Sequence, residues 1–151
     1  WSKFSLPWRC YKKNFIAHLD LKLENIMFNP ETNKIKIIDF GFSETASHYK
    51  MLTQFRGSTH YVSPQVLYKS YNGFKADMWS LGVISYALLS GVFPFDGDNQ
   101  VNVFFKIKKA SFEIPLHFSA NATSLVQTLL NPNESFRPYC SEISNHPFLT
   151  T

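Results

Sequence analysis

Residues 77–89 constrain the fold of this chain more than any other segment. They are apolar on nearly every side, and Gly91 follows where a helix would end. A helix of this kind is buried all round, so the rest of the chain has to surround it. The apolar stretch 78–93 is interrupted by residues such as Ser80 and Gly82, and it falls short of the roughly 20 residues of a bilayer span. The sequence therefore predicts the core helix of a globular domain.

The remaining patterns predict a mostly α fold with one small β element. Helical patterns occupy three further segments: 101–110, 119–130 and 141–145. A β-branched run at 35–38, preceded by a turn at 29–33, predicts a hairpin over residues 26–38. Asp39 would then follow the second strand directly. Residues 43–65 have no clean period and many hydroxyl side chains, which predicts a long irregular loop.

The composition argues against several other classes of protein. The 151 residues are 44% hydrophobic and 17% charged, as in a single globular domain. The formal charge of +4 comes from scattered lysines without a long basic run, so neither nucleic acid nor a membrane is an expected partner. Cys10 and Cys140 form no C-x-x-C motif, so no zinc or redox site is predicted. Residues 1–10 lack the apolar core of a signal peptide, and we expect the chain in the cytoplasm or nucleus.

Two short motifs carry the candidate chemistry. Asp20 lies two residues after His18 and five before Asn25, and the tripeptide Asp39-Phe40-Gly41 begins nineteen residues after Asp20. Each motif alone is weak and fits an ordinary turn. Their joint order and spacing resemble the catalytic loop and the metal-binding motif of eukaryotic protein kinases.

The resemblance to protein kinases extends over nearly the whole chain. It continues in five downstream motifs: residues 57–65, 77–83, 93–95, Arg137-Pro138 and His146-Pro147-Phe148. It implies a partial kinase domain over residues 1–151, with a catalytic loop at 18–25, an activation segment at 39–65 and a helical subdomain at 77–148. Only the C-terminal lobe is recognisable. The glycine-rich phosphate loop and the strand lysine of the N-terminal lobe have no counterpart, and residues 1–10 contain Pro7 and no helical stripe.

The resemblance assigns chemical roles to four polar side chains. Asp20 and Lys22 would be catalytic, with Asp20 near the acceptor hydroxyl and Lys22 neutralising charge on the transferred phosphate of ATP. Asn25 and Asp39 would bind the nucleotide as ligands of magnesium. Lysine at position 22, together with Ser58, is similar to the serine/threonine branch. The implied reaction is transfer of the ATP γ-phosphate to a Ser or Thr of a protein substrate.

The same resemblance suggests a branch of the family and several supporting residues. Three segments are most similar to the AMP-activated and microtubule-affinity-regulating kinases: 39–43, 79–91 and 94–97. His18 and Asp77 would hold the catalytic loop from within the protein, and Phe40 would pack between lobes.

Three positions depart from the family pattern. Leu19 replaces an arginine that binds a phosphate on the activation segment, and Gln54 replaces the threonine that carries this phosphate. Thr53 is a displaced substitute. Gln65 replaces a glutamate that would pair with Arg137, and losing one partner of a buried ion pair typically costs about 3–5 kcal/mol. We therefore expect the pair of Gln65 and Arg137 to destabilise the fold.

Two interpretations of function follow. The first is a serine/threonine kinase that uses ATP and magnesium, although the isolated chain is expected to be inactive because half of the ATP pocket has no counterpart. The alternative is a truncated, catalytically inactive pseudokinase-like docking module that presents residues 58–65 and 93–98, or a pseudogene product. The sequence leaves the oligomeric state open.

Overall fold

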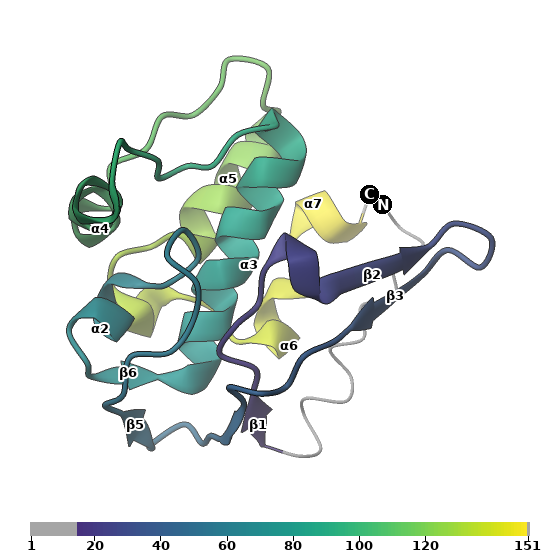
Figure 1. Cartoon of the computed structure of the whole chain (residues 1–151). Helices are drawn as coiled ribbons and strands as arrows, with labels where there is room; N and C mark the ends of the chain where they lie inside the picture. Colours follow the sequence, from purple (N-terminus) through teal and green to yellow (C-terminus); the bar gives the residue numbers. More distant parts are fainter. Residues whose placement is uncertain (1–14, 151) are drawn as a thin grey trace.

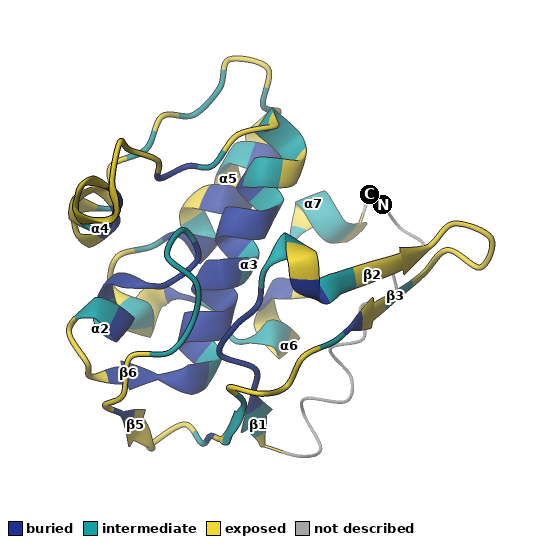
Figure 2. Ribbon diagram, in the orientation of Figure 1, coloured by how far each residue is buried: buried dark blue, intermediate teal, exposed yellow. Residues whose placement is uncertain are grey.

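The computed structural model describes residues 15–150, and a long central helix organises this part of the chain (Figure 1). Helix α3 (Gly73–Ser90) begins where the side chain of Asn72 accepts hydrogen bonds from two backbone amides of the first turn. It ends at Gly91, whose φ of 81° is the left-handed conformation that glycine adopts at little cost. Much of the helix is buried (Figure 2), and Trp79 and Val83 are completely so. The prediction of a core helix is confirmed.

Helix α5 (Ala120–Leu129) packs along α3 and completes the centre of the fold. The hydroxyl of Ser119 caps its first turn. Close approach of the two helices depends on Gly82, because a Cβ there would lie 2.8 Å from side-chain atoms of Leu129 and Leu130. A glycine inside the apolar stretch is therefore a packing requirement of this helix pair.

Helices α2 (Pro64–Leu67) and α4 (Gln100–Lys109) contact each other beside α3, at the left of Figure 1. The side chain of Asn99 caps α4, and the helix buries Val103 and Ile107. The helices predicted over 101–110 and 119–130 are both confirmed, and each observed end lies one residue from the predicted end.

The described chain contains three two-stranded antiparallel sheets. The predicted hairpin is confirmed as β2 (Ile26–Asn29) paired with β3 (Lys34–Ile37). The other two sheets join distant segments: β1 (Ile16–Ala17) with β4 (Glu44–Thr45), and β5 (Met51–Leu52) with β6 (Tyr71–Asn72). The prediction of a single small β element was therefore wrong, because the described chain has three such sheets. Residues 43–65 also contain strands, which at two residues each are too short to produce a visible alternation in the sequence.

The chain ends in short elements packed against α3 and α5. These are the 3-10 helix η3 (Glu134–Phe136) and the helices α6 (Cys140–Ile143) and α7 (Pro147–Thr150); a further 3-10 turn, η2 (Leu23–Asn25), precedes β2. The helix predicted near 141–145 is confirmed in α6. The expectation for residues 1–10 lies outside the described part of the chain. No helix within residues 15–150 is both long and apolar enough to cross a bilayer.

Candidate active site

The loop 18–25 is held from below by a carboxylate of the central helix. The two oxygens of Asp77 accept hydrogen bonds from the backbone amides of His18 and Leu19, at 2.7 and 2.9 Å. Burial raises the pKa of Asp77 to about 7, while the hydrogen bonds from the two backbone amides lower it. Leu19 has a φ of 66°, an uncommon conformation for a residue with a side chain. The bonds to Asp77 therefore fix the backbone where it turns toward Asp20.

His18 ties the same loop to the hairpin. Its ring is fully buried, Nδ1 accepts the backbone amide of Asp20 at 3.2 Å, and Nε2 lies 3.0 Å from the carbonyl of Ile38. A neutral imidazole protonated at Nε2 satisfies both bonds. Phe40 contacts the ring edge to face, with 4.8 Å between the ring centres. His18 is therefore a hydrogen-bonded support, as the sequence predicted.

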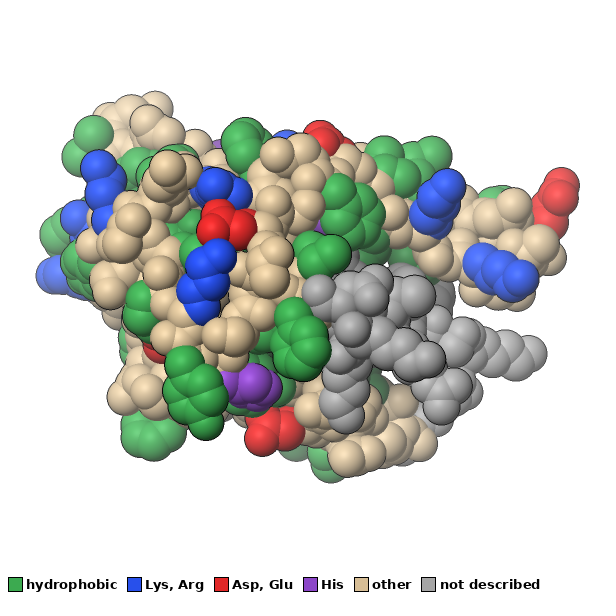
Figure 3. All heavy atoms as spheres, turned by 90° about the horizontal axis from the view of Figure 1, so that it is seen from below, with side chains coloured by type: hydrophobic (Ala, Val, Ile, Leu, Met, Phe, Trp, Pro, Cys, Tyr) green, Lys and Arg blue, Asp and Glu red, His purple; other side chains and the backbone are tan. Residues whose placement is uncertain are grey.

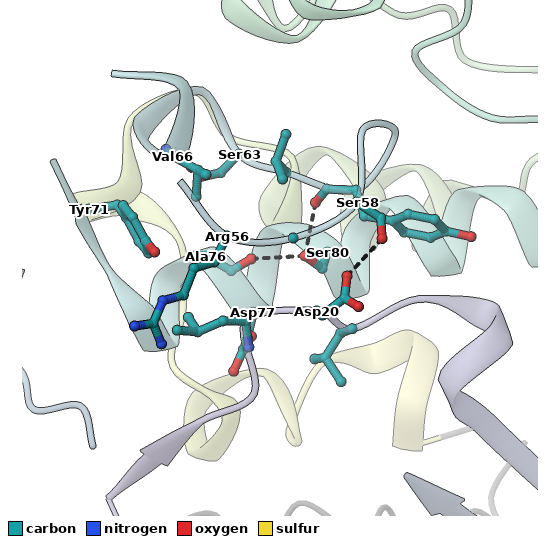
Figure 4. Close-up of a pocket in the computed structure, with 14 residues that line it drawn as sticks. Asp20, Arg56, Ser58, Ser63, Val66, Tyr71, Ala76, Asp77 and Ser80 are labelled. Atoms are coloured by element: carbon teal, nitrogen blue, oxygen red, sulfur yellow. Dashed lines mark hydrogen bonds between the residues drawn. The ribbon is translucent and has the colours of Figure 1, made fainter. Parts of the chain in front are cut away.

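Asp20, Lys22 and Ser58 form one cluster of polar side chains, of which Figure 4 shows Asp20 and Ser58. The hydroxyl of Ser58 donates to Oδ1 of Asp20 at 2.8 Å, and the ammonium of Lys22 lies 3.0 Å from Oδ2. The same ammonium donates to the oxygen of Ser58 at 3.0 Å. Asp20 is only 4% exposed, so both partners stabilise a carboxylate that is largely removed from water.

Asn25 and Asp39 lie at the same edge of the hairpin. The register pairs Ile26 with Ile37, and the amide of Ile38 donates to the carbonyl of Asn25 at 3.0 Å. Strand β3 ends at Ile37, so Asp39 lies two residues past the strand and next in sequence to Ile38. The side-chain nitrogen of Asn25 donates to the carbonyl of Asp20 at 2.9 Å. This bond orients the amide group, and its oxygen is the atom that could bind a metal.

These two side chains suit magnesium better than a metal with an all-protein ligand set. Within residues 15–150, no three His, Cys, Asp or Glu side chains come together as a metal-binding group. Magnesium is commonly held by one or two protein oxygens, with water and substrate phosphates as its other ligands. Asn25 and Asp39 supply oxygen donors of this kind, and Asp39 is exposed to an incoming ligand.

The cavity beside Asp20 is small. It is lined by residues of the loop 18–25, of segment 39–65 and of α3, and its volume is about 10 Å³, room for about one water molecule. A nucleotide does not fit there.

Arg137 is the most deeply buried cation of the described chain, and Gln65 is one of its partners. Its exposed fraction is 1%, and burial lowers its pKa to about 10. The guanidinium donates to the carbonyls of Asn131 and Lys75, at 2.9 and 2.7 Å, and to the side-chain oxygen of Gln65. The nitrogen of Gln65 in turn donates to the carbonyl of Pro132 at 2.6 Å. The substituted glutamine thus makes two hydrogen bonds, a role that the sequence alone did not reveal.

Lys75 is a second buried charge that the sequence analysis did not detect. Its ammonium donates to the carbonyl of Arg137 and lies 3.6 Å from the ring centre of Tyr139. Burial lowers its pKa. The only signal in the sequence was its position two residues before Asp77. The structure shows that this position lies in the first turn of α3, where most neighbouring residues are buried.

Comparison with known proteins places the chain in a family. The family model of the protein kinase domain matches residues 9–149. The chain therefore belongs to the protein kinase family.

Three curated relatives are representative of the matches. The chain is 39% identical over 141 residues to the mitosis inducer protein kinase cdr1 of Schizosaccharomyces pombe, covering 93% of this chain and 24% of that protein. It is 40% identical over 143 residues to the probable serine/threonine-protein kinase MARK-A of Dictyostelium discoideum, with coverages of 94% and 13%. It is 40% identical over 136 residues to the SNF1-related protein kinase catalytic subunit alpha KIN12 of Arabidopsis thaliana, with coverages of 90% and 27%. The chain thus spans about a quarter or less of the length of these relatives, and the likeness to the MARK and SNF1-related kinases agrees with the branch inferred from the sequence.

Proposed function

We propose that the chain is the C-terminal lobe of a serine/threonine protein kinase domain. In this proposal residues 18–25 are the catalytic loop, 39–65 the activation segment and 77–148 the helical subdomain. The cluster of Asp20, Lys22 and Ser58 carries the proposal. It puts a buried carboxylate, a cation and a hydroxyl within 2.8–3.0 Å of one another, at the end of a loop fixed from two sides.

The chemistry assigned to the cluster is transfer of a phosphoryl group to a protein hydroxyl. Asp20 would accept a hydrogen bond from the acceptor hydroxyl and take its proton as the new P–O bond forms, while the bond between the γ-phosphorus and the bridging oxygen breaks and ADP leaves. A carboxylate oxygen has two lone pairs, so Asp20 can bind this hydroxyl while Ser58 remains in place. Lys22 would neutralise negative charge on the transferred phosphate. Its ammonium is already held in position by Asp20 and Ser58.

Asn25 and Asp39 are the proposed magnesium ligands. Magnesium supplies positive charge to the phosphates of ATP and orients them for transfer. The hairpin β2–β3 positions both side chains, since its register sets Asn25 before one strand and Asp39 after the other. The proposed substrate is a Ser or Thr of another protein.

A second candidate function is a catalytically inactive docking module. The small cavity beside Asp20 favours it, because within residues 15–150 no enclosed space for a nucleotide accompanies the polar cluster. Several large apolar side chains near the hairpin and residue 40 are about half exposed: Phe15, Met27, Phe28, Phe40 and Phe42. A further protein segment would have to cover this face before ATP could be enclosed.

Binding of Mg·ATP by the 151-residue chain separates these functions. We would follow the melting temperature with and without Mg·ATP, for the unmodified chain and for Asp39→Asn. Asparagine tolerates the left-handed φ of 61° at this position, so the change removes the charge with little backbone strain. Asp98→Asn, a change of the same chemistry at an exposed residue beyond α3, is the matched control.

A magnesium-dependent rise in melting temperature that Asp39→Asn abolishes and Asp98→Asn keeps would support the kinase site. At a nucleotide concentration about 100 times the Kd, such binding stabilises a protein by about 2.7 kcal/mol. A melt that does not respond to Mg·ATP would contradict nucleotide binding by this chain and favour the docking module.

A further inference from the structure

Three charged side chains in segment 39–65 bond to one another. The carboxylate of Glu44 lies between the ammonium of Lys50, at 2.8 Å, and the guanidinium of Arg56, at 2.9 Å. Of the four ion pairs found within residues 15–150, two share this carboxylate. Figure 3 shows the lower face of the molecule, where an acidic side chain lies between basic ones. We call these three residues the Glu44 cluster.

Arg56 also bonds to the backbone and to a neighbouring side chain. Its Nη1 donates to the carbonyl of Phe42 at 2.8 Å, and its Nη2 donates to the side-chain oxygen of Gln54 at 3.1 Å. Phe42 and Glu44 lie near the start of the segment, and Arg56 lies near its end. One guanidinium therefore joins two parts of the segment that lie fourteen positions apart in the sequence.

The end of the segment that Arg56 fixes is the end that carries Ser58. Gly57 separates the two residues and has a φ of 113°. A Cβ at Gly57 would lie 3.1 Å from the carbonyl oxygen of Leu19, so the chain passes directly over the loop 18–25 at this point. Figure 4 shows the consequence: Ser58 points to Asp20, whereas Arg56 extends to the other side.

Leu19 cannot replace Arg56 in holding the two parts of the segment together. Leu19 lies directly beneath the turn at Gly57, is buried, and has no charge to offer the segment. Gln54 is neutral, and it uses its side-chain oxygen to accept from Arg56. The tie between the start and the end of the segment therefore depends on the guanidinium and on Glu44, whose pKa is lowered by its hydrogen bond from Lys50.

We propose that Arg56 is a positioning residue that, through Glu44 and the carbonyl of Phe42, holds Ser58 against Asp20 and Lys22 without a phosphate on the segment. This inference rests on the proposed function, because it concerns the regulation of the same site. Single exposed ion pairs contribute little. Here the two pairs share one carboxylate, and the hydrogen bond to Phe42 adds a backbone anchor, so the contacts form a network.

Hydrogen–deuterium exchange of the full chain tests the proposal without nucleotide or substrate. We expect Arg56→Gln to accelerate exchange of the backbone amides of residues 42–58 by roughly tenfold. In this variant the segment can open locally without breaking the contacts of the Arg56 guanidinium. Arg56→Lys keeps the positive charge at this position and should retain most of the protection that Arg56→Gln loses. Lys36→Gln, on the exposed side of β3, is the control for loss of one positive charge.

Salt provides a second measurement on the unmodified chain. Screening at 1 M NaCl should accelerate exchange in residues 42–58 and leave α3 unchanged. Packing alone would produce neither the salt effect nor the protection that Arg56→Lys retains. If Arg56→Gln fails to fold, the salt measurement tests the proposal alone. Exchange rates in residues 42–58 that do not change with salt would then overturn it.

The outcomes also separate this inference from the proposed function. Exchange within twofold of the unmodified chain in Arg56→Gln, or an equal loss of protection in Arg56→Lys, overturns the role of Arg56 whatever the chain binds. Accelerated exchange in Arg56→Gln that Arg56→Lys largely avoids supports that role even if Mg·ATP leaves the melting temperature unchanged, in which case the kinase function alone fails.

Discussion

The substitution Gln65→Glu tests how the buried guanidinium of Arg137 is stabilised. At present all three acceptors of Arg137 are neutral oxygens, and none of the ion pairs within residues 15–150 includes it. A glutamate would replace a neutral acceptor with a charged one. The existing bond already has a charged donor, so the gain is only what a second charge adds. Hydrogen bonds to charged groups span about 1.5–3 kcal/mol, which allows a gain of up to about 1–2 kcal/mol.

A second contact of Gln65 reduces this gain. Its nitrogen donates to the carbonyl of Pro132 at 2.6 Å, and a carboxylate cannot donate there. Losing that bond costs about 1 kcal/mol at most, because the side chain is half-buried and water can approach. The net stabilisation expected at neutral pH is therefore at most about 1–2 kcal/mol. For a chain of this size each kcal/mol raises the melting temperature by about 2–4 °C.

Thermal melting at several pH values is the assay for this substitution. A carboxylate paired with a buried guanidinium has a lowered pKa in the folded state, so the gain is present at neutral pH and is lost as pH falls through that lowered pKa. Gln127→Glu, the same change on the exposed face of α5, controls for added negative charge. An unchanged melting temperature, or an equal rise in Gln127→Glu, would show that neutral acceptors already satisfy Arg137 and that the expected destabilisation does not exist.

Three further predictions concern the loop 18–25 and the core. The pKa of Asp77 is raised to about 7, so the folded protein binds a proton there more tightly than the unfolded chain, and the free energy of unfolding should decrease from about pH 4 to 7. Asp77→Asn should abolish this pH dependence in urea titrations. It should also cost about 1–3 kcal/mol, because one backbone amide loses its acceptor. A slope that survives the change would refute that origin. Gly82→Ala should destabilise by about 1–3 kcal/mol in the same assay because its Cβ would lie 2.8 Å from α5, whereas Ser85→Ala on the same helix should cost less. Asp20→Asn should lower phosphate transfer by about 10²–10⁴-fold in a domain with a complete nucleotide site, yet keep the Mg·ATP shift that Asp39→Asn loses; equal loss of both signals would reassign Asp20 to nucleotide binding.

The long helices and the hairpin could be predicted from the sequence because their patterns are local. Helix α3 repeats apolar residues over several turns, and the β-branched run of β3 follows a clear turn. Strands β1, β4, β5 and β6 could not be predicted, since each has two residues and exists only through pairing with a distant segment. The spacing of the motifs also assigned Asp20, Asn25 and Asp39 to one candidate site. That Asn25 and Asp39 hold magnesium there stays a prediction.

Side-chain partners within the site followed from the sequence only where a motif named them. The support of the loop by His18 and Asp77 was expected and is present. The bond between Arg56 and Glu44 was not expected, because it depends on how an irregular segment folds back on itself. The burial of Lys75 was missed for the same reason: its partners are the carbonyl of residue 137 and a ring at residue 139, both far along the chain.

The departures from the family pattern lie at the edge of the proposed site, and the inner supports are intact. Asp77 and His18 hold the loop from two sides, and Ser58 closes it from the third. At two of the altered positions the side chain makes a contact of its own: Gln54 accepts a hydrogen bond from Arg56 of the Glu44 cluster, and Gln65 bonds to Arg137 through its neutral oxygen. These contacts hold both parts of segment 39–65 in place. The ordering of this segment is therefore the property on which the proposed kinase and docking functions both depend.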